Sequence, residues 1–94
     1  MVRNEIKNFQ EIPNVGKATQ KDFILMGINE PFQLVGRDPY QMYNDLYLIT
    51  SQRHDPCVID VFISAVRYME GGAAKKWWEF TLERKNHMDI QRIS

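Results

Sequence analysis

The stretch Ile12-Pro13-Asn14-Val15-Gly16-Lys17-Ala18-Thr19 is followed by a helical segment that ends at Gly27. Its proline, asparagine and glycine predict a tight turn that opens a helix, because asparagine and glycine tolerate positive φ angles. Val15 can turn inward and anchor that turn. The first backbone amides of a helix have no partner within the helix, and the helix dipole favours negative charge there. The stretch therefore predicts a small pocket suited to a phosphate oxygen.

The same residues resemble the helix-hairpin-helix motif, whose usual form is Leu-Pro-Gly-Val-Gly followed by a helix. The resemblance implies that the hairpin amides hold a nucleic-acid phosphate without reading bases. Two positions depart from the pattern: Asn14 replaces the first glycine, and Gln20 replaces a small alanine. Asparagine is the mildest replacement for a glycine with positive φ, whereas we expect the bulkier Gln20 to loosen packing between the helices. Many such hairpins only connect helices, so the motif indicates the fold more strongly than DNA binding.

We predict that six residues at this turn bind nucleic acid. Lys17 and Lys21 lie four residues apart and so share one helix face beside the predicted pocket. Arg3, Lys7 and Arg37 can extend that face. The alternative is an ordinary solvated helix surface, whose field the neighbouring Asp22 weakens. The predicted binding residues are Asn14, Val15, Gly16, Lys17, Ala18 and Lys21.

The length of 94 residues is typical of one domain with one modest core. We assign residues 1–83 to a single domain and residues 84–94 to a C-terminal tail that can fray. No apolar run is long enough to span a membrane, and the first residues lack an apolar signal segment. The single cysteine, Cys57, excludes an internal disulfide and fits a reducing compartment. We therefore expect a cytoplasmic protein that does not bind membranes.

The charges of the chain argue against strong autonomous DNA binding. Twelve basic and twelve acidic residues give a net charge of zero, whereas nucleic-acid binders often carry a positive excess. Residues 38–74 carry a net charge of −3, and the segments before and after them carry +1 and +2. Any nucleic-acid surface must therefore use the two ends of the chain.

Three acid–proline pairs predict helix starts, because the carboxylate can accept from free amides and proline lacks an amide proton to satisfy. We interpret the carboxylates of Glu30, Asp38 and Asp55 as caps and not as catalytic groups. No segment alternates like a strand. We expect an all-α, compact helix-hairpin-helix (SAM-like) domain of about five helices. The expected segments are Asn4–Gln10, Lys17–Met26, a short turn at Pro31–Leu34, a helix from Pro39, a helix from Pro56, and Ala73–Leu82.

The helix from Pro56 has the clearest apolar periodicity in the chain and should be the central buried helix. Asp60, Ser64 and Arg67 form its narrow polar strip, and Ile59 and Ile63 widen its apolar stripe. We expect the centre of the core to contain five of its residues, Val58, Val61, Phe62, Ala65 and Val66.

With these elements placed, several segments resemble a small bacterial family, the pathogenicity-locus proteins, often described as mitomycin-resistance proteins. The resemblance spans about residues 9–82 and implies a role in DNA damage or DNA transactions, with no established reaction. The arrangement is more distantly similar to the C-terminal domain of bacterial competence regulators. The matching segments are Ile12–Ile28, Leu34–Pro39, Gln52–Phe62, Val66–Tyr68 and Trp77-Trp78, of which Arg53-His54-Asp55-Pro56-Cys57 is the most distinctive string.

The string Arg53-His54-Asp55-Pro56-Cys57 also permits a chemical interpretation. A thiol in the first turn of a helix can have a depressed pKa, and a neighbouring imidazolium would add to that effect. The alternative, which we prefer, has His54 and Asp55 capping the helix while Cys57 is buried as a small apolar side chain. We expect no enzyme activity, no cofactor and no metal site, since His54, Cys57 and His87 make a poor ligand set.

The segment 75–80, Lys-Lys-Trp-Trp-Glu-Phe, combines basic and aromatic residues, as surfaces that stack single-stranded bases do. We prefer the interpretation in which Trp77 and Phe80 close the core, Trp78 is partly exposed and the lysines lie in solvent. Two functions remain open. The first is a domain that binds nucleic-acid backbone weakly and without sequence preference. The second is a protein-interaction module of the same fold, in which the hairpin is only a connector.

Overall fold

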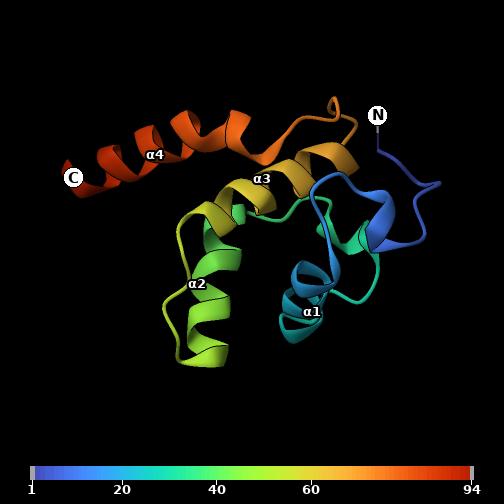
Figure 1. Ribbon diagram of the computed structural model, residues 1–94, viewed down its shortest axis with the longest axis horizontal. Helices are drawn as coiled ribbons and strands as arrows, with labels where there is room; N and C mark the ends of the chain where they lie inside the picture. Colours follow the sequence, from blue (N-terminus) through green and yellow to red (C-terminus); the bar gives the residue numbers. More distant parts are fainter. Residues whose placement is uncertain (1, 94) are drawn as a thin grey trace.

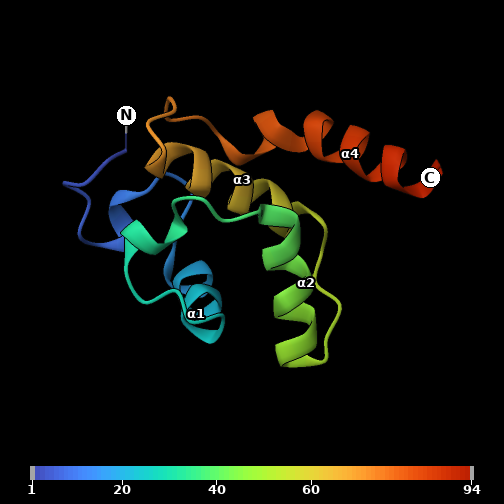
Figure 2. The same cartoon turned by 180° about the vertical axis from the view of Figure 1, so that it is seen from behind.

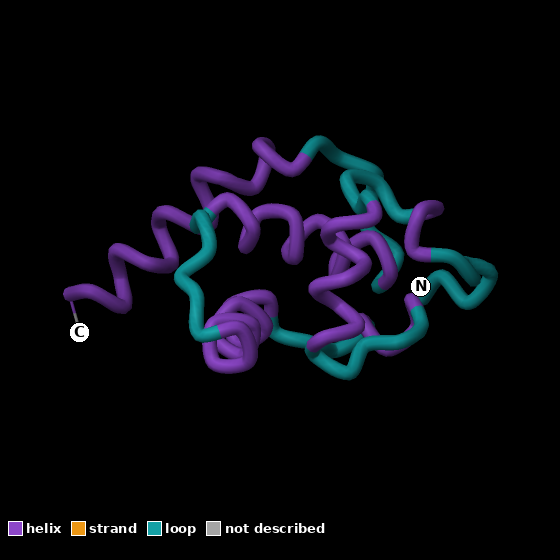
Figure 3. The backbone as a smooth tube through the Cα atoms, turned by 60° about the horizontal axis from the view of Figure 1, so that its bottom comes forward, coloured by secondary structure: helices purple, strands orange, loops and turns teal. Residues whose placement is uncertain are grey.

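Helix α3 lies at the centre of the fold and packs against α2, α4 and the 3-10 turns η2 and η3. Our computed structural model describes residues 2–93. Figures 1 and 2 show α1 and α2 on one side of α3 and α4 on the other. Figure 3 shows helices and loops throughout these residues, which confirms the predicted all-α fold. The elements are η1 (Phe9–Glu11), α1 (Lys17–Leu25), η2 (Pro31–Leu34), α2 (Pro39–Thr50), α3 (Cys57–Met69), η3 (Trp77–Phe80) and α4 (Thr81–Ile93).

The apolar face of α3 supplies much of the core, as its periodicity predicts. Phe62, Ala65 and Val66 are buried, which confirms three of the five expected positions. Val58 and Val61 are only half-buried, and this part of the prediction was wrong. The buried stripe is rotated from the expected one because α3 is covered from both sides. Its full set of buried apolar residues is Ile59, Phe62, Ile63, Ala65, Val66 and Met69.

The polar strip of α3 attaches the C-terminal helix to the core. Asp60 is completely buried, and its carboxylate accepts from the Thr81 hydroxyl at 2.7 Å and from Arg84 Nε at 3.0 Å. Farther along the strip, Arg67 forms an exposed ion pair with Glu83. One buried and one exposed charge pair therefore hold the first turn of α4 against α3.

The helix predicted at Asn4–Gln10 does not form. The amides of Lys7 and Asn8 donate instead to the Glu11 carboxylate, at 3.1 and 2.8 Å, and only the short turn η1 follows. Upstream, Arg3 fixes the chain to the C-terminal end of α3: its backbone amide donates to the Met69 carbonyl at 2.9 Å. These contacts hold residues 3–8 against other parts of the molecule in a non-helical path.

The C-terminal region also differs from the prediction. The expected helix Ala73–Leu82 is replaced by a loop over residues 73–76, the turn η3 and then α4. Residues 84–93 lie in α4, and the expectation that residues 84–94 form a tail that can fray remains a prediction. The assignment of residues 1–83 as the domain remains a prediction.

The local signals for the middle helices are confirmed. Helix α1 ends at Leu25 and is followed by Gly27 with φ +82°, after which the amide of Ile28 donates to the Phe23 carbonyl at 2.8 Å. Asp38 caps α2 by accepting from the amide of Tyr40 at 2.9 Å. Asp55 caps α3 by accepting from the amide of Cys57, also at 2.9 Å. Within residues 2–93, every helix is too short or too polar to cross a membrane.

Candidate nucleic-acid interface

The turn before α1 is held by two of the predicted site residues. Asn14 has φ +69°, the left-handed conformation that its residue type tolerates. Its side-chain amide donates to Ser64 Oγ at 2.9 Å and to the Lys75 carbonyl at 2.7 Å. Val15 is buried, as expected, and its backbone amide donates to the Ile12 carbonyl at 3.2 Å. The Asn14 side chain is therefore hydrogen-bonded within the fold, and the Val15 side chain is buried. Both residues position the start of α1 that follows them.

Gly16 does not adopt the positive φ that its residue type tolerates. It precedes the first residue of α1 with φ −102° and ψ −170°, an extended conformation open to any residue. A Cβ atom added to it would meet nothing within 4 Å. The glycine therefore leaves open space next to the helix start, and Asn14 is the residue of the pair that takes the left-handed conformation.

The start of α1 presents unused amides to solvent. Gly16 offers no side-chain cap, and within the described part of the chain no protein acceptor takes the amides of Lys17 and Ala18. Gly16, Lys17, Ala18 and Lys21 are all exposed. These four of the six predicted residues are therefore placed to meet a ligand, at the end of a helix where the dipole favours an anion.

Gln20 makes a hydrogen bond across the hairpin, and the expected loosening of the packing remains a prediction. Its side-chain oxygen accepts a hydrogen bond from the side-chain amide of Gln10, which lies in η1. The long side chain thus reaches across the turn and links the two elements of the hairpin. The first of these elements is only the short turn η1, so the helix-hairpin-helix assignment remains a prediction.

A second pair of lysines lies close to Asn14 of the turn. Because Asn14 binds the Lys75 carbonyl, Lys75 and Lys76 are brought to the hairpin from a position about 60 residues later in the chain. An open cavity of about 360 Å³ lies between these lysines and the hairpin turn. Its lining residues are Pro13, Asn14, Ala74, Lys75, Lys76 and Glu79.

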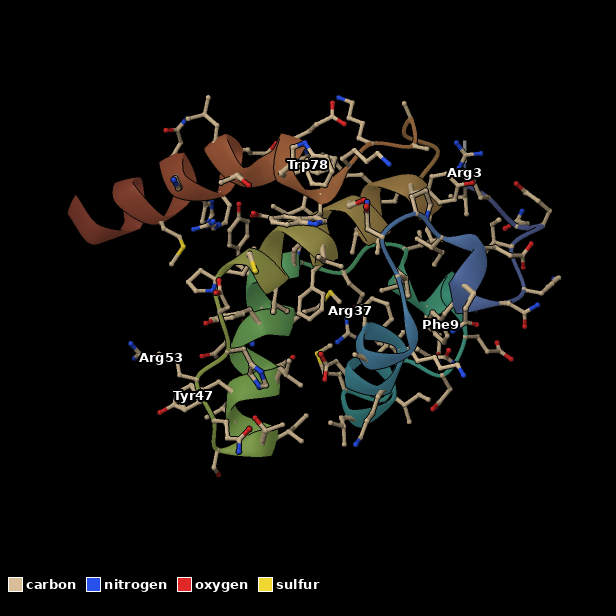
Figure 4. The ribbon with its side chains drawn as sticks, viewed as in Figure 1. Arg3, Phe9, Arg37, Tyr47, Arg53 and Trp78 are labelled. Carbon is tan, nitrogen blue, oxygen red and sulfur yellow. The ribbon has the colours of Figure 1, made fainter. Side chains whose placement is uncertain are left out.

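Two other basic residues suggested for this face, Arg3 and Arg37, lie elsewhere in the structure. The Arg3 guanidinium donates to the Tyr68 carbonyl at 2.8 Å and to the Gly72 carbonyl at 2.9 Å, and it covers the Tyr68 ring. Figure 4 shows Arg3 at the end of α3, and Arg37 between α1 and α2. Arg3 therefore stabilises the fold, and the lysines carry the positive charge of the hairpin face.

The residues around Cys57 do not form an activated thiol. Burial, followed by the adjacent Asp55 carboxylate, raises the pKa of the Cys57 thiol above its ordinary value. The His54 ring lies 3.0 Å from the Thr50 hydroxyl, and the Tyr43 hydroxyl donates to the His54 carbonyl. Asp55 caps α3, as the preferred interpretation of this string predicted. Among residues 2–93, no cluster of His, Cys, Asp and Glu side chains is arranged to hold a metal ion.

The comparisons with known proteins agree with the resemblance seen in the sequence. The family described as "Pathogenicity locus" (Cdd1) matches residues 2–86. The chain belongs to this family. It is 38% identical over 85 residues to the "Mitomycin resistance protein McrB" of Streptomyces lavendulae, a match that covers 90% of this chain and 81% of that protein. No solved structure matches the chain.

In this pathogenicity-locus protein, we expect Asn14→Ala to lower the free energy of unfolding by about 1–3 kcal/mol, because Ser64 and the Lys75 carbonyl lose their donor. Gly16→Val should cost less than about 1 kcal/mol, because the added side chain meets open space and ordinary backbone angles. Urea denaturation measures both values. Asn14→Gly keeps the left-handed backbone and separates its contribution from that of the side chain. Equal losses for Asn14→Ala and Gly16→Val would contradict this account.

Stability should also depend on Asp22, at the half-buried face of α1. Burial raises the pKa of its carboxyl above the ordinary 3.8, although His54 and Lys21 oppose the shift. The stabilisation that the protonated Asp22 carboxyl gives to the folded state is therefore complete below pH 3.8. It is lost as the pH rises through the raised pKa of the folded state. We expect Asp22→Asn to be more stable than the parent at neutral pH, with a difference that shrinks towards pH 3.8. Chemical denaturation at several pH values tests this, and a difference that grows on acidification would contradict it.

Proposed function

We propose that this protein is a cytoplasmic binding domain, and not an enzyme, that holds the phosphate backbone of nucleic acid at the start of α1. The observation that carries the proposal is the pair of open amides at the start of α1, with the exposed Lys17 and Lys21 on the same helix. Lys17 and Lys21 flank these amides, and the bond from Asn14 to Lys75 brings Lys75 and Lys76 to the same turn. Backbone amides and lysines recognise phosphate without reading bases, so binding should be independent of sequence.

The family agrees with a role at DNA. The Streptomyces lavendulae relative is named for resistance to mitomycin, and the family resemblance implies DNA damage or DNA transactions. The net charge of zero argues for weak binding, because few phosphates can be neutralised at one turn. We therefore expect the logarithm of the affinity to fall with the logarithm of the salt concentration with a slope of about −1 to −3.

Two substitutions at the turn test this proposal. Lys17→Ala should weaken binding a few-fold and reduce the salt slope by about 1, because one phosphate contact is lost. Gly16→Val should also weaken binding, because a branched side chain would then stand beside the open amides. Fluorescence anisotropy with labelled single-stranded and duplex DNA, at several salt concentrations, measures these effects.

Lys85→Ala is the matched control, because this exposed lysine lies on α4, away from the turn. At salt concentrations that screen the general change in charge, the affinity of this variant for DNA should equal that of the parent. If Lys17→Ala, Gly16→Val and the parent all bind alike, the hairpin is only a connector. The absence of binding at low salt by well-folded protein would exclude the proposal.

A protein-interaction module is the second candidate, favoured by exposed apolar residues. The C-terminal parts of α1 and α2 each expose an adjacent apolar pair, Ile24 and Leu25 on the first helix and Leu48 and Ile49 on the second. Figure 1 shows both helices on the same side of α3. Exposed apolar surface of this kind often marks a protein contact. Loss of a partner on Leu48→Ser substitution, with DNA binding unchanged, would support this function.

A further inference from the structure

Trp78 is the exposed aromatic residue nearest in the chain to the lysines of the hairpin face. Its side chain is 56% exposed, whereas Trp77 is half-buried and Phe80 is buried. Phe80 packs with Ile59 and Ile63, which confirms its predicted place in the core, whereas the part of Trp77 in the core remains a prediction. Figure 4 shows Trp78 over η3 at the start of α4. Neither the core nor the helix attachment uses the exposed ring of Trp78.

Trp78 contacts its neighbour Trp77 and lies on a turn that is anchored to the core. Its ring meets the Trp77 ring edge-on, with the centroids 5.6 Å apart and the planes at 84°. Two residues later, Phe80 packs with Ile59 and Ile63 of α3 and anchors the turn η3. Because the turn that carries Trp78 is anchored, its backbone loses little conformational entropy when a ligand stacks on the ring.

The charges beside Trp78 suit an anionic strand. The Lys76 ammonium lies 6.0 Å from the centre of the Trp78 ring, and Lys75 is exposed next to it. The nearest carboxylate in the cavity, of Glu79, accepts the Lys76 amide at 2.7 Å, so part of its hydrogen-bonding capacity is used within the turn. The cavity of about 360 Å³ places Lys75, Lys76 and Glu79 beside Pro13 and Asn14 of the hairpin, and Trp78 is not among its lining residues.

We propose that Trp78 is a stacking platform for an unpaired base of a strand whose phosphates lie along the hairpin. This inference rests on the proposed function and narrows its partner to single-stranded nucleic acid, or a duplex with an unpaired end. Bases within a continuous duplex already stack on both faces, so an exposed tryptophan gains contact only with an unpaired base. Aromatic stacking accepts every base, which agrees with binding that is independent of sequence.

The test compares an oligothymidylate, the same strand with abasic sites, and a blunt duplex, each followed by fluorescence anisotropy at low salt. The parent should bind the oligothymidylate at least about fivefold more tightly than the abasic strand, because only the former supplies bases to stack. Trp78→Ala should remove this difference and leave binding of the abasic strand unchanged. Trp78→Phe should retain most of it, and tryptophan fluorescence should be quenched on binding of the oligothymidylate by the parent.

Leu82→Ala is the matched control, since Leu82 is 70% exposed on α4 and is apolar without being aromatic. It should bind all three ligands as the parent does. Equal binding of the oligothymidylate and the abasic strand by both the parent and Trp78→Ala would overturn the stacking platform and leave the phosphate site standing. If no nucleic acid binds at all, the phosphate site fails and the platform fails with it. Capture of a protein through Trp78, without any base-dependent binding, would also overturn the inference.

Discussion

Asp60→Ala should lower the free energy of unfolding by about 3–5 kcal/mol, because it removes one partner of a buried ion pair and leaves the other uncompensated. Asp60 is fully buried in α3, and its carboxylate holds both Thr81 and Arg84 at the start of α4. The Arg84 side chain is only 13% exposed and would lose its counter-charge in a partly dry environment. Urea denaturation, followed by far-ultraviolet circular dichroism, measures the loss.

The exposed ion pair between Arg67 and Glu83 is the matched control, because it joins the same two helices at the surface. Glu83→Gln should cost less than about 1 kcal/mol, since water screens the pair. The double variant Asp60→Leu/Arg84→Met should recover much of the stability, because neither charge is then buried alone. If Asp60→Ala costs no more than Glu83→Gln, the buried pair does not hold α4 in place.

Phe62→Ala should destabilise the protein by about 3–5 kcal/mol, through lost apolar burial and the cavity left behind. Phe62 is fully buried in α3 and its ring lies 5.7 Å from that of Phe23 in α1, which in turn lies 5.4 Å from that of Phe9. The three rings join the N-terminal segment, α1 and α3 in one core. A domain of this size typically has about 5–15 kcal/mol of stability, so much of it depends on this one side chain.

Phe32→Ala provides the comparison at the same residue type, because Phe32 is 55% exposed on η2. Its effect should stay within about 0.5 kcal/mol, as for other surface substitutions. Denaturation midpoints of the two variants measure the contrast. Similar losses at the two positions would mean that the aromatic chain from Phe9 to Phe62 is not the centre of the core.

The sequence predicts best those elements whose boundaries are set by neighbouring residues. Local capping and backbone angles set the start of α1 at Lys17 and its termination before Gly27. They also set the starts of η2 and α2 at prolines. The failures come from distant contacts. The helix expected at Asn4–Gln10 does not form, because Arg3 and Glu11 make other contacts there. Helix α4 is attached to the fold by Asp60, which lies more than 20 residues before its bonded partners.

The candidate site shows the same division. The turn, the inward Val15 and the exposed Lys17 follow from the local sequence, and the structure agrees with each. The sequence predicts residues 75–80 as a separate segment, because no local signal links them to the hairpin. The hydrogen bond from Asn14 to the Lys75 carbonyl makes that link. The sequence signal for it is the asparagine in place of the usual glycine, because asparagine has a side-chain donor and glycine has none.

Arg3 has a consequence for the order in which the chain is made. Its partners, the carbonyls of Tyr68, Met69 and Gly72, are synthesised at least 65 residues later. At about 5–20 residues per second, the N-terminal segment waits about 3–13 seconds for them. During that time Ile6 and Phe9, both buried in the finished protein, lack α3 to pack against. The N-terminal segment can therefore reach its final position only after the residues up to Gly72 have been translated.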